Sequence, residues 1–108
     1  MIASLLEALR EKDPGAYGAW KVMHEVYSIR EGCAMSDVWL QAVLQEACQA
    51  RGWFGAVYFG KKDGDLAKVF GHSHCAIISW KDGELYRHIK QFGDSPAEAL
   101  LRCYLVAI

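Results

Sequence analysis

The sequence predicts an α+β fold, in which a four-stranded antiparallel β-meander is packed with α-helices on both faces. The meander is indicated by two related segments, Lys62-Asp63-Gly64-Asp65-Leu66 and Lys81-Asp82-Gly83-Glu84-Leu85, each of which lies between apolar runs. An Asp-Gly pair in this position is typical of a two-residue hairpin, because a type I′ turn requires a positive φ at both central residues. Two Asp-Gly hairpins in tandem therefore predict four strands within residues 53–92.

The expected strands are the apolar runs on either side of the two turns: Trp53–Phe59, Leu66–Phe70, Cys75–Trp80 and Leu85–Phe92. The first of these runs is apolar on both alternating sides, which is typical of a strand that is covered above and below. Helical patterns precede and follow the meander in the sequence. We therefore expect helices on both faces of the sheet.

Three helices are expected before the sheet. Residues 4–12 and 16–29 carry apolar side chains at helical spacing, and they make up the N-terminal part of the chain, residues 1–35. Residues 36–51 form the longest helix, with Ser36 as its capping residue and Gly52 directly after its end.

The final helix, residues 96–108, has the most complete start signal in the chain. Ser95 takes the capping position, Pro96 the first helical position, and Glu98 the position from which a carboxylate caps the backbone in return. The residues that follow are apolar on nearly every side of the helix. We therefore expect this helix to be mostly buried.

Composition and charge exclude several classes of protein. The chain has 108 residues, which is enough for one domain with a core of its own and too few for two. Hydrophobic residues make up 53% of it, which argues against intrinsic disorder. The formal net charge is −1 and the basic residues are dispersed, so we expect no binding of nucleic acid.

The cysteines and the apolar runs indicate a cytoplasmic protein. The four cysteines show no C-x-x-C spacing, and those within apolar helical patterns behave as small hydrophobes in a reducing compartment. The first residues lack the charged segment of a signal peptide. No run approaches the roughly 18 apolar residues that a membrane span needs. We therefore expect no membrane association.

One cluster of side chains invites a metal or catalytic interpretation: His72, His74, Cys75 and, on the next strand, His88. A zinc site needs three or four nitrogen or sulfur ligands that converge on one point. Side chains alternate across a pleated strand, so His72 and His74 are expected on one face and Cys75 on the other. The sequence therefore predicts no metal site and no cofactor, although a bulge near Gly71 would re-aim one of the side chains.

The second expected hairpin places Cys75 and His88 on the same face. A two-residue Asp82-Gly83 loop sets His88 opposite Ile77, which makes it a diagonal neighbour of Cys75. This is the arrangement of a nucleophile and its base, but the sequence indicates no third orienting group and no helix N-terminus that would stabilise an oxyanion. We therefore expect no catalytic residue, and a small Cys/His enzyme or metal-binding protein is the alternative.

The face that carries Tyr86, His88, Lys90 and Phe92 is the candidate surface for a protein partner. Aromatic side chains mixed with cationic ones are typical of protein interfaces. One alternative is that a helix covers the centre of this face. Another is a homodimeric structural protein, since an uncovered sheet edge is a template for pairing with a second copy.

Two segments carry a resemblance to a known family: Asp94-Ser95-Pro96-Ala97-Glu98-Ala99-Leu100-Leu101-Arg102-Cys103-Tyr104-Leu105 and the Trp-bearing helix Ser36-Asp37-Val38-Trp39-Leu40-Gln41-Ala42-Val43. They resemble the phage ABA sandwich domain family of small phage and prophage accessory proteins. The extra N-terminal helices and Tyr104 depart from the family pattern. The resemblance implies a sheet between helices in a mobile-element protein with no established catalytic residues. We therefore expect a small non-enzymatic accessory protein that binds another protein, with antagonism of a host defence or regulatory complex as one such role.

Overall fold

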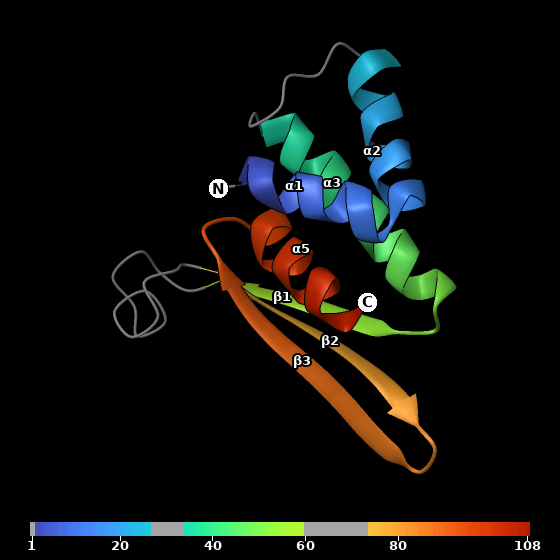
Figure 1. The fold of residues 1–108 in the computed structure, drawn as a ribbon. Helices are drawn as coiled ribbons and strands as arrows, with labels where there is room; N and C mark the ends of the chain where they lie inside the picture. The colour runs from blue at the N-terminus through green and yellow to red at the C-terminus, as the bar shows by residue number, and fades with distance from the viewer. Residues whose placement is uncertain (1, 27–33, 60–73) are drawn as a thin grey trace.

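A computed structural model describes residues 2–26, 34–59 and 74–108 of the chain. Its helices are α1 (Ile2–Lys12), α2 (Pro14–Val26), α3 (Ala34–Ala50) and α5 (Pro96–Ala107). Its strands are β1 (Phe54–Phe59), β2 (His74–Asp82) and β3 (Leu85–Gly93). All of the described helices lie on the same side of the sheet, and α5 is the one that lies along it (Figure 1). The α+β class is confirmed, and for the described residues the expectation of helices on both faces is wrong.

The sheet has three antiparallel strands in the order β1-β2-β3, so the predicted four-stranded meander is wrong. The strand expected at Leu66–Phe70 was to lie between the strands that the structure names β1 and β2. Instead β1 pairs directly with β2, from Phe54 opposite Ser79 to Phe59 opposite His74. Because β3 pairs with the other edge of β2, both edges of β2 are occupied and a further strand cannot pair with β2. The first Asp-Gly segment and Leu66–Phe70 lie outside the described residues.

The hairpin between β2 and β3 is present, but its loop is shifted by one residue from the Asp-Gly pair. Asp82 pairs with Leu85, so Gly83 and Glu84 form the loop. Gly83 has a φ of 66°, which glycine adopts without the steric cost that a side chain would add. The Asp82 carboxylate instead accepts a hydrogen bond from Arg87 Nε at 2.6 Å. The cross-strand register therefore differs by two residues from the expected one, and this even shift leaves every side chain on its expected face.

The core lies between the sheet and the helices. Ala76 and Ile78 point from β2 toward α5 and have no exposed surface. On α5, the side chains of Leu101, Cys103 and Tyr104 are also fully buried. The core cluster continues into the other helices through Leu6, Leu9, Trp20, Leu40, Leu44 and Cys48. The expectation that the final helix is mostly buried is therefore confirmed.

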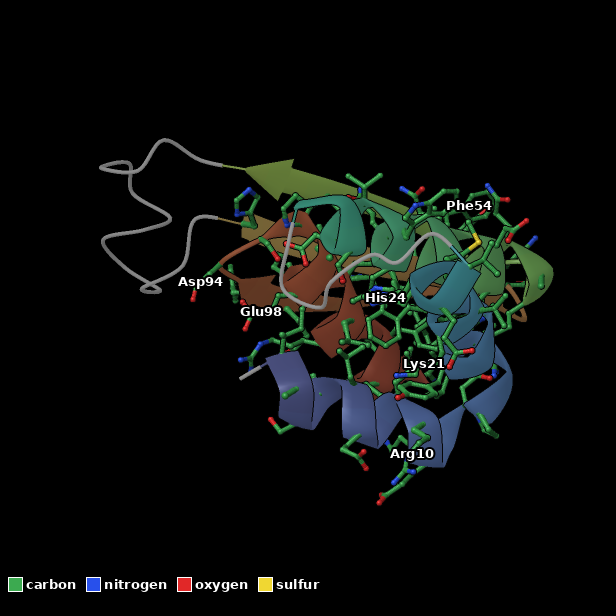
Figure 2. The ribbon with its side chains drawn as sticks, turned by 90° about the horizontal axis from the view of Figure 1, so that it is seen from above. Arg10, Lys21, His24, Phe54, Asp94 and Glu98 are labelled. Carbon is green, nitrogen blue, oxygen red and sulfur yellow. The ribbon has the colours of Figure 1, made fainter. Side chains whose placement is uncertain are left out.

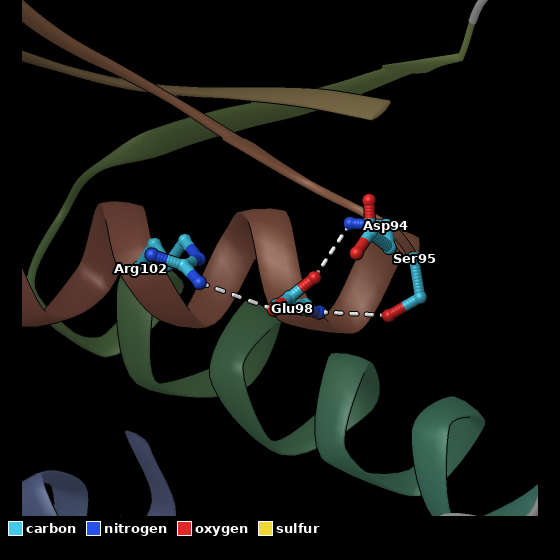
Figure 3. A network of polar contacts seen from close by, with 4 residues as sticks. All are labelled: Asp94, Ser95, Glu98 and Arg102. Atoms are coloured by element: carbon cyan, nitrogen blue, oxygen red, sulfur yellow. Dashed lines mark hydrogen bonds and ion pairs between the residues drawn. The ribbon is translucent and has the colours of Figure 1, made fainter. Parts of the chain in front are cut away.

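The start of α5 follows the predicted capping pattern, as Figure 3 shows. The hydroxyl of Ser95 accepts a hydrogen bond from the Glu98 backbone amide at 3.1 Å. The Glu98 carboxylate accepts one from the Asp94 amide at 2.5 Å and one from Arg102 Nη2 at 3.2 Å. Glu98 is only 6% exposed, and these two donors compensate its buried charge. Local sequence chemistry therefore fixes where this helix begins.

The N-terminal helices differ in detail from the expectation. α2 begins at Pro14 because Asp13 caps it: its Oδ1 accepts a hydrogen bond from the Ala16 amide at 3.1 Å. α3 begins at Ala34, so Ser36 lies inside the helix rather than at its cap. The Ser36 hydroxyl is hydrogen-bonded to His24 Nε2 of α2 at 2.9 Å. This buried contact ties α2 to α3.

Candidate binding face of the sheet

The side of the sheet that faces away from the helices forms one surface, which we call the open face. Cross-strand partners lie on the same side of a sheet, and Ala76 and Ile78 mark the side that the helices cover. The register then places ten residues with described side chains on the open face: Phe54, Ala56, Cys75, Ile77, Ser79, Lys81, Tyr86, His88, Lys90 and Phe92. The four residues expected to bind a partner, Tyr86, His88, Lys90 and Phe92, are therefore on one face.

Exposure on the open face is greatest toward the β2–β3 hairpin. Phe54 lies in one cross-strand row with Ser79 and His88, and its side chain is 69% exposed. Tyr86, in the next row toward the hairpin, is 70% exposed. At the other end of the face, Cys75 is only 6% exposed. The part of the open face that is available to a partner is thus its hairpin half, with two large aromatic side chains in solvent.

The charge on the open face has one sign. Lys81 and Lys90 point to this side, and none of the ten residues of the face is acidic. Asp82 lies on the opposite side of the sheet, where it pairs with Arg87. The two aromatic side chains are therefore accompanied by cations whose charge no neighbouring carboxylate of the same face neutralises.

The residues of the alternative Cys/His site are not brought together. Cys75 is opposite Phe92 and His88 is opposite Ser79, so the two side chains are four positions apart along the sheet. At roughly 3.3 Å per residue this is about 13 Å, whereas the expected register made them diagonal neighbours. His74 lies on the covered side, and His72 is outside the described residues. The register correction removes the contact that a nucleophile and its base require.

Metal and thiol chemistry find no support in the described residues either. Within residues 2–26, 34–59 and 74–108, no group of three histidine, cysteine, aspartate or glutamate side chains could hold a metal ion. Cys48 and Cys103 are buried, and this burial raises the pKa of each thiol to about 11. Both thiols therefore stay protonated at neutral pH and behave as small apolar side chains.

A second polar cluster joins the N-terminal helices to α5. The Tyr104 hydroxyl donates a hydrogen bond to Asp13 Oδ2 at 2.5 Å, and Arg51 Nη2 lies 3.9 Å from the same oxygen. The Arg51 guanidinium lies over the Trp53 ring, 5.2 Å from its centroid. The hydrogen bond from Tyr104 is the largest cause that holds the pKa of Asp13 below its usual value. The hydrogen bond from the Ala16 amide and the charge of Arg51 act in the same direction. Because Asp13 also caps α2, we interpret this cluster as a structural tie.

Phe54 is a large exposed residue of the open face that was not among the four predicted partner-binding residues. The run Trp53–Phe59 predicted a strand covered on both sides, but Phe54, Gly55 and Ala56 are all exposed. β1 is an edge strand, and an apolar edge strand has the same sequence pattern as a buried central one. Only the strand order distinguishes the two cases.

No family model matches the sequence, and no curated protein and no solved structure matches it either. The resemblance to the phage ABA sandwich family therefore stays a prediction. Within the described part of the chain, none of the helices is both long enough and apolar enough to cross a membrane.

Proposed function

We propose that this protein is a non-enzymatic binding domain that docks another protein on its open face. The observation that carries the proposal is the exposure of Phe54 and Tyr86, at 69% and 70%, on a sheet face that none of the described helices covers. Neither side chain belongs to the core cluster, so stability of the fold does not explain why both aromatic rings are in solvent on the same face. Aromatic side chains of this kind are the anchors of protein interfaces.

The charge of the open face defines the kind of partner. Lys81 and Lys90, together with His88, lie around the exposed aromatic side chains. A partner with an apolar pocket and a rim of carboxylates complements this arrangement in both shape and charge. Exposed charges at a rim act mainly on the association rate, and the aromatic anchors contribute most of the affinity.

The biological setting of this binding rests on the sequence resemblance alone. Small accessory proteins of phages and mobile elements suit a compact domain that acts by occupying its partner. A host defence or regulatory complex is the partner that we propose on this basis.

The proposal is tested by affinity capture of a partner from the cells in which the protein occurs, with single alanine variants on the open face. We expect Tyr86→Ala to reduce capture at least about tenfold, which corresponds to the loss of about 1.4 kcal/mol at an anchor. The other three predicted partner-binding residues are tested by the variants His88→Ala, Lys90→Ala and Phe92→Ala. We expect Lys90→Ala to lower the association rate and to make that rate less dependent on salt concentration, because the lysine charge steers the encounter with the partner.

The matched control is Val106→Ala, which changes a side chain of α5 that is 57% exposed and lies away from the sheet face. It should leave capture unchanged. Retention of the partner by all four open-face variants would show that the partner docks elsewhere.

A further inference from the structure

The two edges of the sheet differ in charge. β3, on one edge, carries Arg87, His88 and Lys90. β1, on the other edge, has the sequence Phe54-Gly55-Ala56-Val57-Tyr58-Phe59, without a charged residue or a proline. Natural proteins protect free edges with charges, prolines or bulges, because an unprotected edge pairs with other strands. β3 has this protection and β1 does not.

No described element pairs with the outer edge of β1. Seen from above, β1 forms the margin of the sheet, and no described helix or strand lies beyond it (Figure 2). The backbone groups on this side of β1 therefore have no strand partner within the described part of the chain. A further strand would complete their hydrogen bonding.

Gly55 is the second residue of β1, and among the described residues neither its backbone conformation nor its packing requires a glycine. It is not among the glycines with positive φ, which are Gly52 and Gly83 in the described residues. A Cβ at Gly55 would meet only the Ile77 carbonyl oxygen, at an ordinary 3.8 Å. A glycine weakens a strand, and it often marks a site where another backbone approaches closely.

The surface around Gly55 is hollowed on both sides of the sheet. On the open face a shallow hollow is lined by Phe54, Gly55, Ala56, Ile77 and Ser79. On the helix side a second hollow reaches from Gly55 and Val57 to Gln45 and Gln49 of α3. Strands in a sheet send alternate side chains to opposite faces, so an added strand would place side chains on both of these sides.

The protruding side chain and part of the lining of the open-face hollow belong to the same strand. Phe54 projects from β1 with 69% of its surface exposed, and Ala56 follows two residues later on the same face. If two copies pair antiparallel around a two-fold axis near Ala56, each Phe54 becomes the diagonal neighbour of the other copy's Ala56. The edge of β1 is therefore complementary to itself.

We propose that two copies of the chain pair through the outer edges of β1 to form a homodimer with a continuous six-stranded sheet. Because β1 carries no charge, this pairing sets no like charges against one another, whereas pairing through β3 would bring its cationic residues Arg87, His88 and Lys90 close to those of the second copy. The two-fold axis is perpendicular to the sheet and brings both open faces to the same side. The dimer does not depend on the proposed partner binding, and either one can fail alone.

The experiment is sedimentation velocity of the purified full chain from about 1 µM to about 1 mM, the range in which small interfaces associate. We expect a concentration-dependent monomer–dimer equilibrium. Ala56→Lys, which puts a charge at the two-fold axis, should raise the dissociation constant at least about tenfold. Phe54→Ser removes the protruding ring and should also weaken the dimer.

His88→Lys is the matched control, since it adds the same charge at an exposed position of the open face on β3. It should leave the dimer intact. Circular dichroism checks that each variant is folded. Hydrogen exchange measured at both ends of the concentration range should show slower exchange in residues 54–59 at the high concentration, without a comparable change in residues 85–93.

A wild-type chain that stays monomeric at every concentration would overturn the inference. A dimer that persists in folded Ala56→Lys and Phe54→Ser variants would overturn it too, because the interface would then lie elsewhere. Sedimentation of Tyr86→Ala separates this result from the open-face proposal, since that variant should lose its partner and keep the dimer.

Discussion

Where α5 lies along the sheet, the two faces have opposite chemistry, although the same strands build both. On the covered face, Ala76 and Ile78 have no exposed surface and pack beneath α5. On the open face, Phe54 and Tyr86 are more than two-thirds exposed, at 69% and 70%. Alternation along each strand separates the two sets of side chains. The comparison suggests that the covered face stabilises the fold, while the open face is left for binding.

The largest effect is expected on the covered side, at Leu101 of α5, which is fully buried. Leu101→Ala removes buried methyl groups and leaves a cavity, so it should lower the free energy of unfolding by about 3 kcal/mol. Chemical denaturation measures this change. Val106→Ala, on the exposed side of the same helix, should change it by less than about 0.5 kcal/mol. A loss below about 1 kcal/mol for Leu101→Ala would mean that α5 does not hold the core.

The next effect concerns Tyr104, which ties α5 to Asp13. Burial and the hydrogen bond to Asp13 raise the pKa of Tyr104 to about 12, above its ordinary value of 10.0. The unfolded chain therefore loses this proton first, so the contribution of Tyr104 to stability is complete below pH 10 and is lost as the pH rises toward about 12. Tyr104→Phe should cost about 1.5 kcal/mol at neutral pH and remove this part of the alkaline decline.

Unfolding of the wild type and of Tyr104→Phe between pH 7 and pH 12 measures the effect on the alkaline side. On the acid side, the hydrogen bond from Tyr104 is the largest cause that lowers the pKa of Asp13. Asp13 stabilises the fold above its ordinary pKa, and this contribution is lost as the pH falls through the lowered value. Tyr104→Phe should therefore also reduce the acid-dependent loss. Identical pH profiles for the two proteins would contradict this role of the Tyr104–Asp13 contact.

A smaller effect is expected where α5 begins. Ser95→Ala removes the oxygen that accepts from the Glu98 amide, and the loss of a helix cap costs about 1 kcal/mol. Ser95→Thr keeps an oxygen in place and should recover most of this stability. If Ser95→Ala unfolds like the wild type in denaturant, the cap does not contribute to the stability of the fold.

The parts of the fold that could be predicted are those that local chemistry determines. The start of α5 at Pro96 follows from a cap, a proline and a returning carboxylate, all within a few residues. The faces of the second hairpin were also predictable, even though its loop is Gly83-Glu84 rather than Asp82-Gly83, because a register error of two residues preserves alternation.

The parts that could not be predicted depend on which strands pair. An apolar run such as Phe54–Phe59 does not show whether it becomes a central strand or an edge, because that depends on contacts with residues far along the chain. The separation of Cys75 from His88 could not be predicted either, because it depends on the strand register. The register predicted from the turn sequence alone differs from the observed one by two residues. The four partner-binding candidates share a face because side chains alternate along one strand, which is a local property. The exposure of Phe54 on the same face could be predicted only with knowledge of the strand order.

The division of roles between the two faces is tested most directly by one unfolding measurement on a variant of the open face. Tyr86→Thr, His88→Thr and Lys90→Thr are combined, because threonine retains a preference for strands while the aromatic and cationic groups are removed. We expect the free energy of unfolding to change by less than about 1 kcal/mol in total, as for exposed positions away from the core. A loss of about 3 kcal/mol or more would show that the open face stabilises the fold, and would contradict the claim that it is left for binding.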